Sequence, residues 1–168
     1  MSSFNTDIKT YEFNHTMIRV KDPKASLEFY QEILGMQLVS TMENPGGKFT
    51  LYFLAYVNEK DRAELASKTD DQKRAYAFNR AGILELTHNW GTENDADFSY
   101  ANGNSNPGRG FGHTAIIVDN IDEACKRFES YGDKVKWVKK LTDGTMKNIA
   151  FIADPDGYWV EILNRAFA

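Results

Sequence analysis

Two segments of the chain share a strand-like alternation of apolar and polar residues. Residues 15–20 read HTMIRV and residues 113–118 read HTAIIV, so both begin with His-Thr and are rich in β-branched side chains. Alternate side chains of a strand lie on one face, so this pattern predicts two half-buried strands. Their similarity indicates that the chain contains a duplicated unit.

A helix is predicted after each of these strands. In the first copy, Asp22 is a suitable N-cap, Pro23 suits the first helical position and Gly35 suits the end of the helix. Asn120 and Gly132 occupy the corresponding places in the second copy. Apolar residues recur at helical spacing between these ends, namely Leu27, Tyr30 and Leu34 in the first copy and Ala124, Phe128 and Tyr131 in the second.

Each predicted helix leads into further strands. In the first copy these are residues 48–56 and 81–88, and in the second they are residues 149–152 and 159–163. The sequence DPDG at 154–157 is typical of a tight turn between the last two strands. Both copies therefore fit one scheme, in which a strand and a helix are followed by more strands.

Two segments have no counterpart in the repeat. Residues 59–80 are charged, contain several alanines and are predicted to be helical, whereas residues 91–110 are rich in Gly and Asn and predict a long loop. The resulting domain organisation has four parts. They are a tail at 1–12, a first unit at 13–90 with the insertion 59–80, a connecting loop at 91–110 and a second unit at 111–168.

Composition excludes several classes of function. The 168 residues include 20 Lys and Arg against 24 Asp and Glu, so there is no basic excess for binding nucleic acid. The only cysteine, Cys125, excludes a disulfide framework and a zinc site built from thiolates. The sequence has no secretory signal pattern and no apolar run of transmembrane length, and we therefore expect a cytoplasmic protein.

A His and a Glu recur at matching strand positions in the two units, as His15 with Glu85 and His113 with Glu161. Nitrogen and oxygen donors of this kind suit a divalent metal. A strand Glu can instead face solvent, and a strand His can be a packing residue, which is our interpretation of His88. The repetition of the His–Glu pair favours a metal site.

Strand parity suggests two further residues near this site. Arg19 shares the strand face of His15, and Asn89 shares the face of Glu85 if that strand continues so far. An Arg and an Asn beyond a metal suit an anionic substrate that contains amides. The alternative for Arg19 is a surface salt bridge.

Four segments of the sequence resemble the glyoxalase I family of lactoylglutathione lyases. They read HTMIRVKDP (15–23), LELTHNWGTE (84–93), RGFGH (109–113) and DPDGYWVEI (154–162), and the resemblance extends from about residue 13 to 164. It implies an α+β vicinal-oxygen-chelate fold, in which tandem βαβββ units form curved, half-open sheets around a metal. The chain resembles the longer, eukaryotic-type form of the family.

The resemblance also implies the composition of the metal site. His15, Glu85, His113 and Glu161 would be the four protein ligands of one divalent ion. The site would lie at the interface of a homodimer, with His15 and Glu85 from one chain and His113 and Glu161 from the other. Zinc is the expected metal, with nickel or cobalt as alternatives.

The implied reaction converts the hemithioacetal of methylglyoxal and glutathione to S-D-lactoylglutathione through a metal-bound cis-enediolate. Glu161 would be the base that moves the proton, and Glu85 would remain mainly a ligand. Because the site is nearly symmetric, the catalytic roles of Glu161 and Glu85 could instead depend on the stereochemistry of the substrate. By family position, the residues for glutathione are Arg19, Asn89, Arg109 and Lys139, and those for the apolar wall are Met146, Ile149, Phe151 and Leu163. Thr145 stands where some relatives carry a lysine, so one anion contact is expected to be missing.

Three other functions fit the same fold, namely an epimerase, a dioxygenase or a metal-free module that binds small molecules. Dioxygenases of this type use two His and one carboxylate around iron, and Glu85 as a second carboxylate argues against them. A binding module without metal has no use for four residues of the ligand type. Elemental analysis for a bound metal would distinguish these alternatives.

Overall fold

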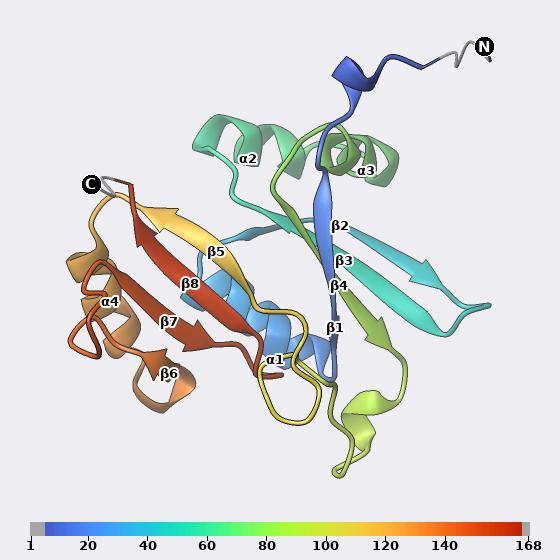
Figure 1. Cartoon of the computed structure of the whole chain (residues 1–168). Helices are drawn as coiled ribbons and strands as arrows, with labels where there is room; N and C mark the ends of the chain where they lie inside the picture. Colours follow the sequence, from blue (N-terminus) through green and yellow to red (C-terminus); the bar gives the residue numbers. More distant parts are fainter. Residues whose placement is uncertain (1–5, 166–168) are drawn as a thin grey trace, which may run out of the picture. The chain divides into compact units, whose positions relative to one another are not determined.

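The computed structural model describes residues 6–165, which form two compact units of mixed α+β structure (Figure 1). Unit 1 contains Gly35–Trp90 and the residues up to Arg19, and unit 2 contains Val20–Leu34 and the residues from Gly91 onward. Each unit has one four-stranded sheet. The predicted α+β fold with a duplicated sheet is therefore confirmed.

The sheet of unit 1 has the strand order β1-β4-β3-β2. Its strands are β1 (His15–Val20), β4 (Ile83–Asn89), β3 (Phe49–Ala55) and β2 (Gln37–Asn44). Strand β3 pairs antiparallel with both β2 and β4. The sequence pattern had not located β2, whose alternation is interrupted by an irregularity in register between Leu38 and Ser40.

The predicted helical insertion forms two helices, α2 (Glu59–Ala66) and α3 (Asp70–Phe78). The Asn58 side chain caps α2, and Thr69 begins a complete capping box at the start of α3. The helices pack on the sheet through a cluster that consists of Val39, Phe53, Ala55, Leu65, Ala77 and Ile83. A short 3-10 turn, Ile8–Thr10, precedes β1.

The sheet of unit 2 has the equivalent order β5-β8-β7-β6. Its strands are β5 (His113–Val118), β8 (Trp159–Asn164), β7 (Ile149–Ala153) and β6 (Lys136–Lys139). Strands β5 and β8 run parallel, whereas β7 pairs antiparallel with both of its neighbours. Helix α4 (Ile121–Glu129) follows β5, as predicted, with Asn120 as its N-cap.

The helix predicted after the first strand is α1 (Pro23–Glu28), which continues as a π-helical turn at Phe29–Ile33. This segment packs within unit 2, although it follows a strand of unit 1. The phenol of Tyr30 donates a hydrogen bond of 2.9 Å to Asp154, and the backbone N–H of Lys21 donates to the Asp156 carboxylate. The turn at 154–157 therefore anchors α1.

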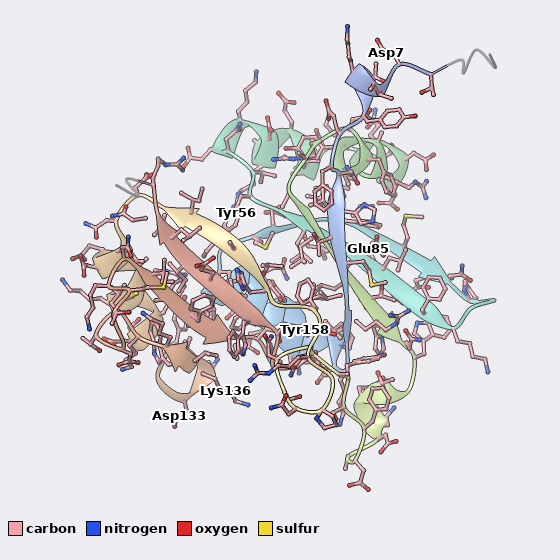
Figure 2. The ribbon with its side chains drawn as sticks, in the orientation of Figure 1. Asp7, Tyr56, Glu85, Asp133, Lys136 and Tyr158 are labelled. Carbon is pink, nitrogen blue, oxygen red and sulfur yellow. The ribbon has the colours of Figure 1, made fainter. Side chains whose placement is uncertain are left out.

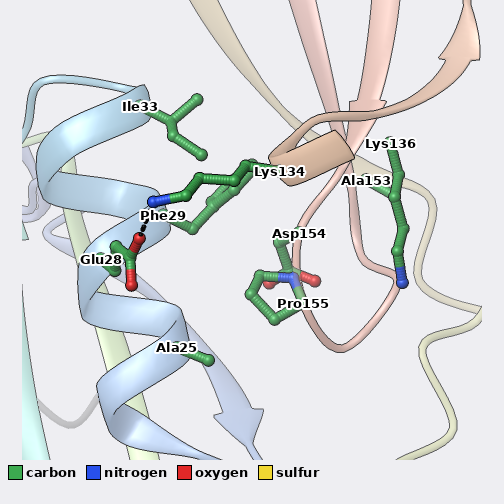
Figure 3. Close-up of a pocket in the computed structure, with 9 residues that line it drawn as sticks. All are labelled: Ala25, Glu28, Phe29, Ile33, Lys134, Lys136, Ala153, Asp154 and Pro155. Atoms are coloured by element: carbon green, nitrogen blue, oxygen red, sulfur yellow. Dashed lines mark hydrogen bonds and ion pairs between the residues drawn. The ribbon is translucent and has the colours of Figure 1, made fainter. Parts of the chain in front are cut away.

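A cavity of about 260 Å³ lies beside α1 (Figure 3). Phe29, Ile33 and Pro155 contribute apolar walls, and Glu28 and Lys134 form an ion pair of 2.6 Å at its edge. The lining includes none of the candidate site residues from the sequence.

The loop predicted at 91–110 is largely irregular, apart from a 3-10 turn at Thr92–Asn94. The Lys21 ammonium donates to the carbonyl oxygen of Phe98 and the Thr92 hydroxyl donates to that of Lys21, so the loop is attached to the start of α1. Within residues 6–165 no helix is long and apolar enough to cross a membrane. The predicted boundaries at 12, 90 and 110 stay predictions, and residues 1–5 and 166–168 lie outside the described residues.

Candidate metal centre and active site

The first candidate site lies on the unit 1 sheet, where β1 and β4 are neighbours, and Figure 2 labels one of its residues, Glu85. His15 Nε2 is 3.3 Å from Glu85 Oε2, and their side chains are 36% and 12% exposed. His15 and Arg19 are exposed while Ile18 and Val20 are buried, so Arg19 shares the face of His15, as parity predicted.

The neighbours of this pair restrain both side chains. The Thr87 hydroxyl donates a hydrogen bond of 3.2 Å to the second carboxylate oxygen of Glu85. His15 Nδ1 lies 2.7 Å from the amide oxygen of Asn14. Phe53, opposite Glu85 in the ladder, makes an edge-on contact with the His15 ring at 6.5 Å.

The second candidate site has the same construction in unit 2. His113 Nε2, on β5, is 3.2 Å from Glu161 Oε2, on the neighbouring strand β8. Phe151 is opposite Glu161 in the ladder, and its ring contacts the His113 ring edge-on at 5.3 Å. The two His–Glu pairs therefore occupy equivalent strands and have equivalent aromatic neighbours.

The donor atoms of each pair fit a divalent metal. Two ligands of one zinc ion, each about 2.1 Å from it, lie about 3.0–3.4 Å apart for bond angles between octahedral and tetrahedral. The observed separations of 3.3 and 3.2 Å fall in this range. No three His, Cys, Asp or Glu side chains between residues 6 and 165 form a group that could hold a metal. Each unit therefore offers two ligands, which is half of the predicted set.

Three candidates for the apolar wall lie on the sheet face of Glu161. Phe151 pairs with Glu161, and Ile149 pairs with Leu163, which is two positions from Glu161 on the same strand. Ile149 is buried, and the other two are half-buried. Met146 lies in the loop between β6 and β7 and is 53% exposed.

The candidate residues for glutathione differ in their surroundings. Arg19 and Arg109 are exposed, the first on β1 and the second in the loop before β5. Asn89 is exposed at the end of β4 and pairs with Phe49. The Lys139 ammonium donates to the carbonyl oxygens of Lys140, Met146 and Ile149, so it closes the loop between β6 and β7.

Sequence reasoning missed Asn14, Thr87 and Phe53 as neighbours of the candidate ligands. Thr87 could have been found by parity, because it is two positions after Glu85 on one strand. Phe53 could not have been found from the sequence, because only the pairing of β3 with β4 brings it opposite Glu85 and beside His15. Nor could Asn14, whose other partners are 63 and 66 residues away in the chain. His88 is buried, as expected of a packing residue.

Comparison with known proteins places the chain in one superfamily. The sequence matches the Glyoxalase/Bleomycin resistance protein/Dioxygenase superfamily over residues 12–162, and the chain belongs to that superfamily. It is 49% identical to a lactoylglutathione lyase of Pseudomonas aeruginosa, over 98% of this chain and 95% of the relative.

Two more relatives extend this comparison. Glyoxalase I of Saccharomyces cerevisiae is 52% identical over 90% of this chain, which spans only 43% of the yeast protein. The solved structure of the trypanothione-dependent glyoxalase I of Leishmania major has a TM-score of 0.64 and is 30% identical, with 92% of this chain and 87% of that chain covered. The likeness thus includes proteins of similar length and a protein about twice as long.

Proposed function

We propose that the chain is a lactoylglutathione lyase, which converts the hemithioacetal of methylglyoxal and glutathione to S-D-lactoylglutathione. The observation that carries this proposal is the 49% identity to the Pseudomonas aeruginosa lactoylglutathione lyase, because it extends over nearly the full length of both proteins. The His–Glu pair, present once in each unit, supports a site of the kind that the proposed reaction needs.

The proposed ligands of one divalent ion are His15, Glu85, His113 and Glu161. Each pair presents one imidazole nitrogen and one carboxylate oxygen at a separation that two ligands of one ion adopt. Zinc is the proposed metal, and the same donors also accept nickel or cobalt. When bound, such an ion supplies Lewis acidity, which stabilises negative charge that develops on substrate oxygens.

We further propose that the site forms between two copies of the chain. His15 and Glu85 of one copy would then share a metal with His113 and Glu161 of the other, so that the two pairs together supply all four ligands. The chain spans 43% of the yeast relative, so that protein is long enough to contain two such segments. The proposed assembly is a homodimer with two equivalent sites.

Glu161 is the proposed base, which takes the proton from C1 of the hemithioacetal and returns it to C2. Both oxygens of Glu85 have neighbours, since one accepts from the Thr87 hydroxyl and the other faces His15. Leu163 stands at the equivalent position beside Glu161 and has no hydroxyl to donate. The Glu161 carboxylate thus has one hydrogen-bond partner fewer than that of Glu85, which supports Glu161 as base and Glu85 as ligand.

The remaining candidates would bind the substrate. Arg19, Asn89 and Arg109 carry polar or cationic groups for the glutathione portion, and Ile149, Phe151 and Leu163 form an apolar surface beside Glu161. Lys139 would bind glutathione only if its ammonium exchanged one of its carbonyl partners for the substrate. Met146, whose carbonyl oxygen is one of these partners, would contribute its side chain to the apolar wall. The eukaryotic-type form and the cytoplasmic location stay predictions.

An absorbance assay for thioester formation tests the proposal. The protein is stripped of metal with a chelator, and methylglyoxal and glutathione are added with zinc, nickel or cobalt in turn. We expect activity to vanish on stripping and to return with at least one of these metals. An absence of thioester product with all three metals would refute the proposed reaction.

A further inference from the structure

The hydrogen bonds of Asn14 determine which nitrogen of His15 carries a proton. The amide nitrogen of Asn14 lies 3.0 Å from the carbonyl oxygen of Ala77 and 2.6 Å from that of Arg80. Carbonyl oxygens only accept, so the NH₂ group of Asn14 must face them and its Oδ1 must face the other way. Oδ1 lies 2.7 Å from His15 Nδ1 and has no proton to donate. His15 therefore carries its proton on Nδ1.

A neutral ring with its proton on Nδ1 has its lone pair on Nε2. Nε2 is the atom that lies 3.3 Å from the Glu85 carboxylate. Two acceptor atoms that face each other at this distance are stable only with a cation or a second proton between them. Asn14 thus occupies Nδ1 and leaves Nε2 of His15 to bind a metal, beside the Glu85 oxygen that would be the second metal ligand.

The inserted helices hold Asn14 in this orientation. Ala77 belongs to the last turn of α3, and Arg80 follows that helix. The Arg80 guanidinium donates to the hydroxyl of Tyr76 and to the carbonyl oxygen of Tyr56, while the Tyr76 hydroxyl donates to Asp61 on α2. The end of α3 is therefore fixed to α2 and to the segment after β3.

Among the described residues of the second unit, up to 165, none holds His113 as Asn14 holds His15. His113 is preceded by Gly112, which has no side chain, and the insertion 59–80 has no counterpart after β7. Asn14 therefore distinguishes the two His–Glu pairs, which otherwise have equivalent strands and aromatic neighbours. The insertion thus has a consequence for His15 that the sequence repeat alone does not reveal.

We propose that Asn14 is a positioning residue, which fixes the tautomer and ring orientation of His15 and is itself held by the C-terminal end of α3. The proposed consequence for metal affinity rests on the proposed function of His15 as a ligand. Removing such a partner of a ligating histidine typically weakens metal binding about 10- to 100-fold.

Nitrogen-15 NMR of the histidine rings in the metal-free protein tests the tautomer directly. The chain has only three histidines, so single substitutions of His88 and His113 assign the His15 signals. We expect Nδ1 of the wild-type ring to carry a proton that it donates to Asn14, and the Asn14→Ala ring to lose that proton, because only Nε2 then faces an acceptor, the Glu85 carboxylate. An unchanged His15 spectrum in Asn14→Ala, or a wild-type ring protonated only on Nε2, would overturn the proposal.

Two further variants separate the tautomer from the stability of the insertion. Asn14→Asp keeps an oxygen that accepts from His15 Nδ1 but cannot donate to Ala77 and Arg80, so it should retain the Nδ1–H tautomer. Asn79→Ala removes a different amide donor at the same helix end, the one that bonds to the Ala75 carbonyl oxygen, and should leave the His15 ring unchanged. A tautomer change in Asn79→Ala equal to that in Asn14→Ala would show that helix stability alone accounts for the effect, and would contradict the proposal.

Metal titration completes the test. Asn14→Ala should bind zinc about 10- to 100-fold more weakly than wild type, and its kcat should recover when zinc is raised to saturation. Equal affinities in the two proteins would contradict the positioning role. If the protein forms no thioester but the tautomer result holds, the proposed reaction fails and the role of Asn14 stands.

Discussion

The phenol of Tyr30 donates a hydrogen bond of 2.9 Å to the buried carboxylate of Asp154, 124 residues later in the chain. Tyr30 follows α1, in the first copy of the repeat, and Asp154 begins the turn before β8, in the second. The other Asp154 oxygen accepts from the backbone N–H groups of Asp156 and Tyr158. The pair therefore joins the helix of one repeat to the turn that precedes Glu161.

Tyr30→Phe should destabilise the protein by about 1–3 kcal/mol, because it leaves one buried Asp154 oxygen without its donor. Urea unfolding monitored by circular dichroism measures this loss. Tyr131→Phe is the matched control, because the Tyr131 hydroxyl also bonds to the segment after α1, at the Glu32 carbonyl oxygen, but is exposed. Equal effects of the two substitutions would contradict a special role for the buried pair.

Burial raises the pKa of the Asp154 carboxyl to about 7, although hydrogen bonds from Tyr30 and the backbone oppose the shift. In the unfolded chain this pKa is about 4. Between these values the folded state holds a proton that the unfolded state has lost, so the stability due to Asp154 falls as pH rises from about 4 to 7. The slope is at most about 1.4 kcal/mol per pH unit.

Asp154→Asn should remove the pH-dependent part of the stability that Asp154 contributes. Urea unfolding of wild type and variant at pH 5 and pH 7.5 gives the difference, in which the other titrating groups cancel. We expect wild type to lose more stability than the variant over this interval. Parallel changes in the two proteins would show that Asp154 does not hold a proton in the folded state.

The fold could be predicted from sequence where interactions between residues close together in the chain determine it. The alternation at 15–20 and 113–118, the caps Asp22 and Asn120, and the helical insertion all correspond to elements that the structure contains. Strand β6 was not located, because it has only four residues and an irregular register with β7. The packing of α1 within unit 2 was not expected either, because it depends on contacts between distant residues such as Tyr30 and Asp154.

The candidate site, too, could be predicted from local sequence patterns only in part. Repetition along the chain was enough to pair His15 with Glu85 and His113 with Glu161. The hydrogen bond from Thr87 was within reach of strand parity, but the anchoring of Asn14 required the three-dimensional fold. The carbonyl partners of Lys139 also depend on how the loop after β6 closes, which no pattern of residues indicates.

Cys125 should react very slowly with iodoacetamide at pH 8. Its side chain is buried in α4, and burial raises the pKa of the thiol to about 11, so little of the reactive thiolate is present. Mass spectrometry should find the native protein unmodified under conditions that label the urea-unfolded chain completely. Rapid labelling of the native protein would contradict the burial of Cys125.

Mixing two inactive variants tests whether a site forms between chains. The first variant carries His15→Ala with Glu85→Gln, and the second carries His113→Ala with Glu161→Gln. If each site combines pairs from two chains, an equal mixture that exchanges subunits should regain about a quarter of wild-type activity, because half the dimers are mixed and each has one intact site. If each site uses both pairs of one chain, the mixture should remain inactive.

Thioester formation by Glu161→Gln tests the central claim most directly, because it replaces the proposed base with an amide that still offers an oxygen to the metal. With methylglyoxal, glutathione and saturating metal, kcat should fall about 10²- to 10⁴-fold, while circular dichroism and thermal stability remain close to wild type. Glu85→Gln is the matched comparison and should mainly weaken metal binding, with kcat recovering as metal is added. A Glu161→Gln protein that turns over at a near-normal rate would contradict the proposed mechanism.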